Sequence, residues 1–493
     1  MNIAIALPLV APLFGAALSM MVRRLAVQRV VSFLSLSVSL VASIIVLVEV
    51  VSEDSMVVSR LGAWPAQVAI TLVADRLSAM MLLVSVTVLT IVLAFAIGQR
   101  ASDERSPFYH PVYLVLAAGI GQAFLAGDLF NLFVAFELLL MASYVLLTLD
   151  GTDAQIRTGT TYVVLNVVES FVLLTAIGLI FAATGTVSMA ELPARLAELP
   201  DEVRTGLNLL LLVAFGIKAA VFPLYFWLPD AYPTAPSSVT AVFAGLLTKV
   251  GVYAMLRTET LLFPGGQSTL LLVIAGFTMI VGVLGAISHA EMKRILSFHI
   301  VSQIGYMVLG IGIGGDAAIA ATVFYLMHHI PVKTSLFLVE GIVERETGTS
   351  AFDAVGGMAR RSGFLAVLFL IPALSLAGLP PFSGFLAKYA LVRAGFDDGQ
   401  YVIVGVAIAG SLLTLISMTK IWNGLFWGEV EPAVPDGHVG VLRHQRLMSV
   451  STMAMVGCTL AIAALAGPLY SFCIGAAQQL GDPMQYVQAV LDA

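Results

Sequence analysis

Long apolar runs follow one another along almost the whole chain of 493 residues. Only 11% of the residues are charged, against roughly 25% in an average soluble domain. A run of about 20 apolar residues is long enough to cross a bilayer as a helix. The pattern predicts an all-α polytopic membrane protein with about fourteen transmembrane helices, near residues 3–22, 30–51, 76–97, 110–127, 129–149, 158–184, 206–228, 236–257, 268–288, 295–314, 317–343, 363–394, 402–426 and 447–475.

Basic residues are unevenly distributed between the two sets of loops. If the N-terminus lies outside, thirteen fall in inner loops and four in outer loops, with two more at helix ends. This is the positive-inside pattern, and it predicts that both termini lie outside a prokaryotic plasma membrane. The first apolar run precedes Arg23 and Arg24, which favours a transmembrane helix over a cleavable signal. The small net charge of −6 does not indicate nucleic-acid binding.

Five of the six lysines lie inside apolar runs, whereas the loops use arginine almost exclusively. Arginine stays charged in proteins, but a buried lysine can lose its proton because desolvation disfavours the charged form. This usage favours proton handling. The alternative is that the lysines extend to the nearest interface, which suits Lys420 best because it is near a helix end. The five are Lys218, Lys249, Lys333, Lys388 and Lys420.

Residues 216–251 contain two apolar helices, one lysine in each, and four intervening prolines: GIKAAVFPLYFWLPDAYPTAPSSVTAVFAGLLTKVG. A helix break at membrane depth is tolerated only when it is buried in protein or lines a wet cavity. Intramembrane charges are costly, so Lys218 and Lys249 around such a break predict a site for moving charge.

A second stretch, residues 373–392, has a similar order of features: ALSLAGLPPFSGFLAKYALV. Lys218 and Lys249 are 31 residues apart, and Lys388 and Lys420 are 32 apart. The broken helices are the seventh and twelfth, and an offset of five predicts that helices 4–8 and 9–13 form inverted repeats. Lys218 precedes its prolines and Lys388 follows its pair, so residue-by-residue equivalence stays open. The predicted parts are 1–109, 110–257, 258–426 and 427–493.

Two glutamates lie within predicted helices. Glu137 is nine residues past Asp128, about 13 Å into the membrane, where a carboxylate is either protonated or paired. Lys218 is the expected partner, and the pair would form a proton switch or a static ion pair. For Glu169, with Asn166 one turn before it, a packing role and a functional role are equally compatible with the pattern.

Histidines mark two further helices. His329 and Lys333 are four residues apart and share a helix face, with Pro331 between them expected to loosen the helix. Histidine titrates near neutrality, which suits a relay, while hydrogen bonding alone is the alternative. His328 lies on another face, and His299 could mark the inner mouth of a proton path. No metal-binding pattern and no cofactor motif is evident, and both cysteines are expected to be packing residues.

These stretches, together with EMKRILSFHIVSQIGYM, MHHIPVKTSLFLVEG and LPPFSGFLAKY, resemble signature sequences of the antiporter-like subunits. That family occurs in respiratory NADH:quinone oxidoreductase (complex I), membrane-bound hydrogenases and multisubunit Mrp-type cation/proton antiporters. LGAWPAQVAITLVADRLSA at 61–79 and FNLFVAFELLLMASYVLL at 130–147 look most like the D-type branch of the Mrp antiporters. The resemblance implies a buried proton-transfer axis comprising Glu137, Lys218, Lys249 and Lys388, with His329 and Lys333.

The resemblance also implies function and partners. We expect a proton-translocating subunit of a monovalent cation (Na+)/proton antiporter, assembled with an A-type large subunit and small membrane subunits. The alternatives are a proton-pumping subunit of complex I or of a hydrogenase, and a structural scaffold. Tyr225 and Tyr232 stand where relatives often have histidine, so their role as relay groups is open. Lys420 is a candidate from the repeat alone.

Overall fold

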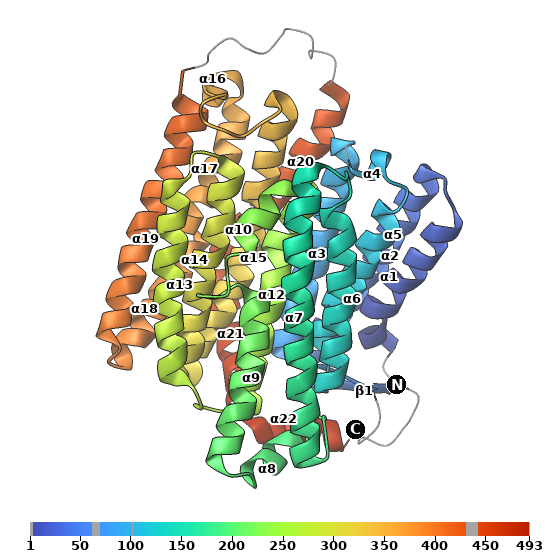
Figure 1. Ribbon diagram of the computed structural model, residues 1–493, viewed down its shortest axis with the longest axis vertical. Coiled ribbons are helices and arrows are strands. Elements are labelled where there is room, and N and C mark those ends of the chain that lie inside the picture. The colour runs from blue at the N-terminus through green and yellow to red at the C-terminus, as the bar shows by residue number, and fades with distance from the viewer. Residues whose placement is uncertain (1–2, 62–69, 101, 430–441, 493) are drawn as a thin grey trace.

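The computed structural model describes residues 3–61, 70–100, 102–429 and 442–492. Helices run side by side along its long axis, and ten described helices are long and apolar enough to cross a membrane (Figure 1). The protein is therefore a mostly helical, multi-pass membrane protein. Parts of the 61–79 motif and of the predicted region 427–493 lie outside the described residues.

The first half of the chain contains the elements up to the end of the first broken region. In order they are α1 (Ile3–Met21), α2 (Leu25–Ser52), β1 (Val57–Leu61), β2 (Ile70–Ala74), α3 (Arg76–Gln99), α4 (Ser102–Arg105), α5 (Tyr109–Leu125), α6 (Leu129–Leu147), α7 (Asp153–Thr184), α8 (Leu192–Ala197), α9 (Asp201–Ala219), α10 (Leu228–Ala231), the 3-10 helix η1 (Tyr232–Thr234), α11 (Ser237–Val242), the π-helix η2 (Phe243–Leu247) and α12 (Thr248–Leu261).

The second half contains the second broken region and the C-terminal helices. In order they are α13 (Ser268–Ser288), α14 (Met292–Ile313), α15 (Gly315–Thr347), α16 (Met358–Arg361), α17 (Gly363–Ala377), α18 (Ser383–Asp397), α19 (Tyr401–Ile421), the π-helix η3 (Trp422–Trp427), α20 (Leu442–Ala464), α21 (Ala466–Gly481) and α22 (Pro483–Leu491).

Both predicted helix breaks are present, and each follows a left-handed residue. Ala220 ends α9 with φ 59°, and Gly378 ends α17 with φ 85°. Neither conformation continues an α-helix, so the chain turns before α10 and α18 begin. α15 continues through Pro331 from Gly315 to Thr347, so this proline does not break the helix, although it cannot donate a backbone hydrogen bond there.

The prediction of an exclusively helical chain missed a hairpin. β1 and β2 pair antiparallel, with Val57 opposite Ala74 and Leu61 opposite Ile70. Their sequences, VVSRL and ITLVA, are rich in β-branched residues, which favour strands. The short helices α8 and α22 were also not predicted.

Helix α15 occupies the centre of the bundle. Its residues from Ala318 to Val343 are all buried, and it contacts α3, α11, η2, α14, α17, α18, α20 and α21. The most hydrophobic window of the segment from Ser237 to Leu261 is also completely buried. Lipid-facing exposure is instead concentrated on outer helices such as α1, α2 and α7. The ionisable residues of the central helices are therefore held away from lipid.

The two ends of the bundle differ in character. α4 and α16, which carry Arg105, Arg360 and Arg361, lie at one end, whereas β1, α8, α22 and both termini lie at the other (Figure 1). Predicted inner and outer loops are thus segregated to opposite ends.

A buried ion pair joins the helices at the end that bears the termini. Arg257 on α12 contacts Asp75, the N-cap of α3, with Nη1 and Oδ2 2.6 Å apart. Asp75 also accepts hydrogen bonds from Ser78, and the guanidinium lies over the rings of Tyr253 and Tyr486 at 5.4 and 5.5 Å. The positive-inside pattern placed Arg257 in an outer loop, but α12 extends past it and only 5% of the residue is exposed.

We predict that Asp75→Asn destabilises the protein by about 3–5 kcal/mol, because it leaves a buried guanidinium without its counter-charge. The measurement is the thermal unfolding midpoint of the detergent-purified protein. Asp54→Asn is the matched control: Asp54 also pairs with an arginine at 2.6 Å, but 76% of its side chain is exposed, so its loss costs under about 1 kcal/mol. Equal effects of the two substitutions would contradict the prediction.

Candidate functional site

Most of the side chains that are predicted to form the relay are buried inside the helix bundle. The exposed fraction is 0% for Lys249, His329 and Lys333, 2% for Lys218 and 6% for Lys388. Glu169 is also fully buried, whereas Glu137 is half-buried. Burying a charge is costly unless polar neighbours stabilise it, so the neighbours of each group indicate whether its charge is fixed or free to change.

The first group lies between α6, α7 and α9. Lys218 is in the last turn of α9, its Nζ lies 5.8 Å from the ring centre of Phe136, and it has no hydrogen-bond partner in the described part of the chain. Glu137 accepts a hydrogen bond from Ser170 on α7. The expected ion pair between Glu137 and Lys218 is therefore not formed by direct contact.

Two acids, Glu169 on α7 and Glu137 on α6, are near enough to Lys218 to interact with it electrostatically. Neither carboxylate oxygen of Glu169 has a hydrogen-bond partner among the described residues. A packing role alone would favour a hydrogen-bonded carboxylate, because an unpaired buried polar group is costly. Lys218 therefore has two acids among its electrostatic neighbours instead of the one that was expected.

Lys249 lies just after the π-helix η2. Its Nζ donates to the carbonyl oxygen of Ala244 at 2.5 Å and to Oγ1 of Thr248 at 3.2 Å. A π turn departs from the regular helical hydrogen-bond pattern and is frequent at functional sites. A Cβ atom on Gly245 would collide with Thr334 Oγ1, so the absence of a side chain there brings η2 against α15.

On α15, His329 and Lys333 face this π-helix. Neither ring nitrogen of His329 nor Nζ of Lys333 has a hydrogen-bond partner among the described residues. Both residues interact electrostatically with Lys249. The His329 ring is stacked on Tyr325, with centroids 6.3 Å apart, and Lys333 lies 5.8 Å from the Phe337 centroid. His329 and Lys333 thus present nitrogen atoms without hydrogen-bond partners among the described residues, and Lys249 is an electrostatic neighbour of both.

Lys388 lies at the second helix break. Its Nζ donates to the carbonyl of Leu376 at 2.9 Å and to Ser411 Oγ at 3.1 Å. The amine also lies 4.9 Å from the ring centroid of Tyr306. A Cβ atom on Gly378 would come within 2.8 Å of Lys388 Cδ, so the glycine makes room for the lysine to reach the end of α17.

A pair of stacked tyrosines connects this lysine with the centre. Tyr306 and Tyr325 have centroids 5.5 Å apart and are nearly parallel, and Tyr325 is the ring that stacks on His329. The Tyr325 hydroxyl donates to Gln303 Oε1 at 2.5 Å. Side chains thus form a continuous path from Lys388 to His329.

The other two candidate histidines, His328 and His299, are hydrogen-bonded. His328 Nδ1 lies 2.8 Å from Ser383 Oγ at the start of α18, and His299 Nε2 lies 2.9 Å from Ser417 Oγ on α19. His299 is also in electrostatic contact with Lys333 and Lys388. His328 therefore reaches the second helix break, and His299 is held against α19; its place at an inner mouth of a proton path stays a prediction.

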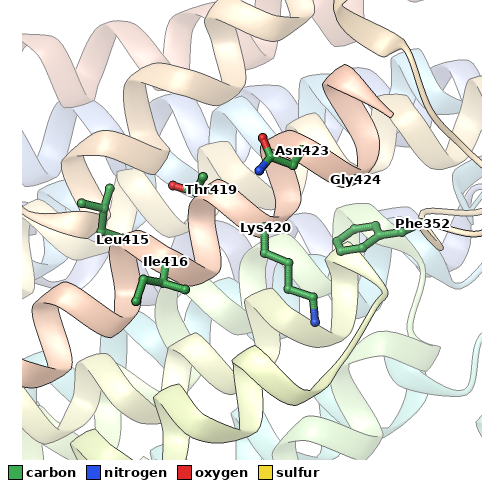
Figure 2. Close-up of a pocket in the computed structure, with 7 residues that line it drawn as sticks. All are labelled: Phe352, Leu415, Ile416, Thr419, Lys420, Asn423 and Gly424. Atoms are coloured by element: carbon green, nitrogen blue, oxygen red, sulfur yellow. The ribbon is translucent and has the colours of Figure 1, made fainter. Parts of the chain in front are cut away.

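Three other candidates lie outside this path. Lys420 donates to the carbonyls of Ile287 and His289, at 2.7 and 2.6 Å, and so caps the end of α13. It borders a surface cavity of about 760 Å³ whose lining also includes an aromatic ring and an amide (Figure 2). Tyr232 is buried with its ring beside an indole, and Tyr225 is half-buried. Within the described part of the chain, no hydrogen bond joins these three side chains to the lysines of the path.

One carboxylate of this site was not predicted from the sequence. Glu340 lies seven residues after Lys333 on α15, is completely buried, and has no hydrogen-bond partner for either oxygen among the described residues. One turn further, Glu344 pairs with Lys293 at 3.1 Å. Four residues of α15 lie on one helix face, because they are separated by steps of four, seven and four: His329, Lys333, Glu340 and Glu344. This periodicity could have identified the two glutamates from the sequence.

Comparison with known proteins is consistent with this arrangement. The family model described as NADH:quinone oxidoreductase/Mrp antiporter, TM, matches residues 126–414. The chain is 41% identical to the D subunit of the Na(+)/H(+) antiporter of Alkalihalophilus pseudofirmus over 100% of both chains. It is 35% identical to the Bacillus subtilis protein of the same name over 89% of this chain and 90% of that one.

Solved structures show the same fold. A chain of the Mrp complex from Dietzia sp. has a TM-score of 0.93 at 35% identity, with 100% of both chains covered. A chain of respiratory complex I from Thermus thermophilus has a TM-score of 0.76 at 20% identity, covering 95% of this chain and 98% of that one, which shows a likeness of fold alone. The family expected from the motifs is confirmed, and the chain belongs to the NADH:quinone oxidoreductase/Mrp antiporter family of transmembrane proteins.

Proposed function

We propose that this chain is the proton-translocating D-type component of a multisubunit Na+/proton antiporter in a prokaryotic plasma membrane. The observation that carries the proposal is a set of buried nitrogen and carboxylate groups without hydrogen-bond partners, formed by Lys218, Glu169, His329 and Lys333 among the described residues. Stability alone does not favour such groups, because each costs desolvation energy that no partner offsets.

The proposed relay runs from Glu137 through Lys218, Lys249, and His329 or Lys333 to Lys388. The helices that carry Lys218 and Lys249 touch directly: a Cβ atom on Gly251 of α12 would lie 2.7 Å from the backbone nitrogen of Ala219, the residue after Lys218. Lys249, His329 and Lys333 are coupled electrostatically. The tyrosine stack and hydroxyl groups then lead to Lys388, with mobile water proposed to complete the hydrogen-bonded steps.

The driving step is proposed to be movement of Lys218 between two carboxylates. The amine rests over the Phe136 ring with no direct bond to Glu137 or Glu169, so it can approach either one. Approach to an acid favours its ionised form, and withdrawal favours its protonation. Moving one charge through 100 mV is worth about 2.3 kcal/mol. That energy is comparable to a shift of one to two pKa units in a proton-carrying group, at about 1.36 kcal/mol per unit.

Glu340 and Glu344 lie on one face of α15, and we propose that they carry protons from the centre of the bundle to the arginine-rich end. Glu340 lies seven residues from Lys333, about 10 Å along the helix, and Glu344 and Lys293 continue toward that end. Glu340 also interacts electrostatically with both Lys293 and Glu344. We assign to Glu340 the role of passing protons between Lys333 and the inner surface.

The fold supports the finer topology proposed for the chain. We propose fourteen crossings, with α5–α12 and α13–η3 as inverted repeats between the flanking parts 1–109 and 427–493. The neighbours correspond: α5 with α6, α6 with α7 and α7 with α9 are matched by α13 with α14, α14 with α15 and α15 with α17. Each repeat also carries a π-helix beside a lysine, at η2 and η3.

The remaining assignments concern the surroundings of the subunit. The segregation of basic loops supports termini on the outside, and the partners are proposed to be an A-type large subunit and small membrane subunits. A proton-pumping subunit of a redox complex is the second candidate, favoured by the likeness in fold to the complex I chain. Membrane vesicles distinguish the two, because an antiporter exchanges Na+ for protons without a redox substrate.

We predict that Lys218→Arg lowers Na+-driven proton flux in vesicles by roughly 10²-fold, the contribution of one acid–base group. Arginine keeps the charge but does not release its proton, so a relay fails whereas a static charge is retained. Flux is normalised to the amount of assembled complex. Lys420→Arg is the matched control, because Lys420 caps α13 and is expected to tolerate a permanent charge. Wild-type flux in Lys218→Arg would refute the relay.

We predict that Glu169→Gln lowers the Na+-driven proton flux as severely as Glu137→Gln, because Lys218 is proposed to move between these two acids. The side-chain volume is nearly unchanged, so packing is preserved. Glu198→Gln, at an exposed position on the loop after α8, serves as the control. If Glu169→Gln keeps full flux while Glu137→Gln loses it, Glu169 has only a packing role.

We predict that Gly251→Ala reduces the flux without removing any charge. The added methyl group would lie 2.7 Å from Ala219 N and push α12 away from the lysine at the end of α9. Gly178→Ala on α7 is the control, because nothing lies within 4 Å of the atom it would add. Both variants are compared for flux per assembled complex. Equal flux in the two would show that this close approach does not matter for transfer.

A further inference from the structure

We propose that a cavity at the end bearing the termini binds a partly hydrated monovalent metal cation between Glu259 and Asp316. The inference rests on the proposed antiport function for the identity of that cation as Na+. The cavity has a volume of about 430 Å³ and is bordered by the ends of α12, α13, α14 and α15, with α21 and α22 beside them. At roughly 30 Å³ per water molecule, it has room for a cation and several waters.

Glu259 carries the proposal. It lies in the last turn of α12, 6% of it is exposed, and its Oε1 is buried without a hydrogen-bond partner in the described part of the chain. The side chain of Asn208 lies within hydrogen-bonding reach of the same carboxylate, so the cost falls on Oε1. An unpaired buried carboxylate oxygen is costly, and this one also lies near the negative end of the α12 dipole. Helix electrostatics therefore oppose a carboxylate here, whereas a bound cation would compensate for both costs.

Asp316 supplies the second carboxylate. It lies in the first turn of α15, where a negative charge is favourable, and borders the same cavity from an exposed position. Its Oδ1 lies close to Gly481 at the end of α21. The two acids thus approach the space from different helices, one buried and one open to solvent.

The rest of the lining favours a weakly held, hard cation. None of the described residues that border the cavity is a lysine or an arginine, and Arg257, the arginine on α12, is committed to Asp75. Hydroxyl groups of Thr260 and Ser268 add further oxygen ligands, the type that hard cations prefer. Among the described residues, no group of three or more His, Cys, Asp or Glu side chains is arranged to hold a metal, so strong divalent binding is not expected.

The position connects the site with the relay. Glu259 is ten residues beyond Lys249 on the same buried segment, about 15 Å along the helix. A cation held there disfavours a second positive charge on Lys249 through the poorly screened interior. Cation binding at this end would therefore promote release of a proton from the centre of the relay.

The test is Na+-dependent thermal stability of the purified whole complex, in the presence of NaCl, KCl or choline chloride at constant ionic strength. A ligand that binds only the folded state raises the unfolding midpoint as its concentration rises. We expect Glu259→Gln to raise the Na+ concentration for half of this effect by roughly tenfold or more. Its midpoint in choline should not fall, because the substitution removes the costly buried charge. Asp316→Asn should have a smaller effect. Glu202→Gln, an exposed acid in the first turn of α9, is the matched control.

An unchanged Na+ dependence in Glu259→Gln overturns the proposal, as does a variant that changes only the response to pH. A stronger stabilisation by Ca2+ than by Na+, lost in Glu259→Gln, also overturns it, because the site would then be divalent. The proposed function fails separately: if Lys218→Arg keeps full proton flux while Glu259→Gln loses Na+ stabilisation, the site stands without the relay. If the relay variants lose flux and Glu259→Gln binds Na+ normally, the relay stands without the site.

Discussion

The cost of holding an ammonium group in an apolar interior explains the irregular backbone of this protein. Lys218 lies in the last turn of α9, where the helix dipole is negative, and Lys388 binds a carbonyl at the end of α17. Lys249 uses the carbonyl of Ala244 within a π-helix. Each departure from a straight helix thus provides partial negative charge to one lysine. A directly bonded acid would instead fix the proton of that lysine permanently.

Charges with a structural role are treated differently. Asp75 and Arg257 are directly paired at 2.6 Å. This pair lies toward the end of the bundle that bears the termini, whereas Lys218, His329 and Lys333 have no hydrogen-bond partners among the described residues. Pairing lowers the cost of a buried charge but also fixes it in place. A relay needs the opposite property, because a group bound tightly in one protonation state cannot exchange its proton.

Much of the fold and the identity of the central lysines could be predicted from the sequence, because apolar length and intramembrane charge are local signals. The β1–β2 hairpin was missed, because two strands of five residues give a much weaker sequence signal than the long apolar runs on either side of them. The second acid near Lys218 was not predicted, because Glu137 and Glu169 lie on different helices and their distances from Lys218 depend on packing. Glu340 did leave a signal, its seven-residue spacing from Lys333, but only the shorter spacing to His329 was used.

Lys249 and Lys420 occupy corresponding positions in the two proposed repeats, yet their side chains have different surroundings. Lys249 and Lys420 both lie next to a π-helix, yet Lys249 turns into the centre and Lys420 turns outward to cap α13. The difference follows from the neighbours. Segment α11–α12 is buried on all sides, so its lysine can reach only the interior, whereas α19 is largely exposed and its lysine finds carbonyls at the end of an adjacent helix. The same local sequence pattern therefore yields a buried lysine, the proposed relay group, in one half and a helix cap in the other.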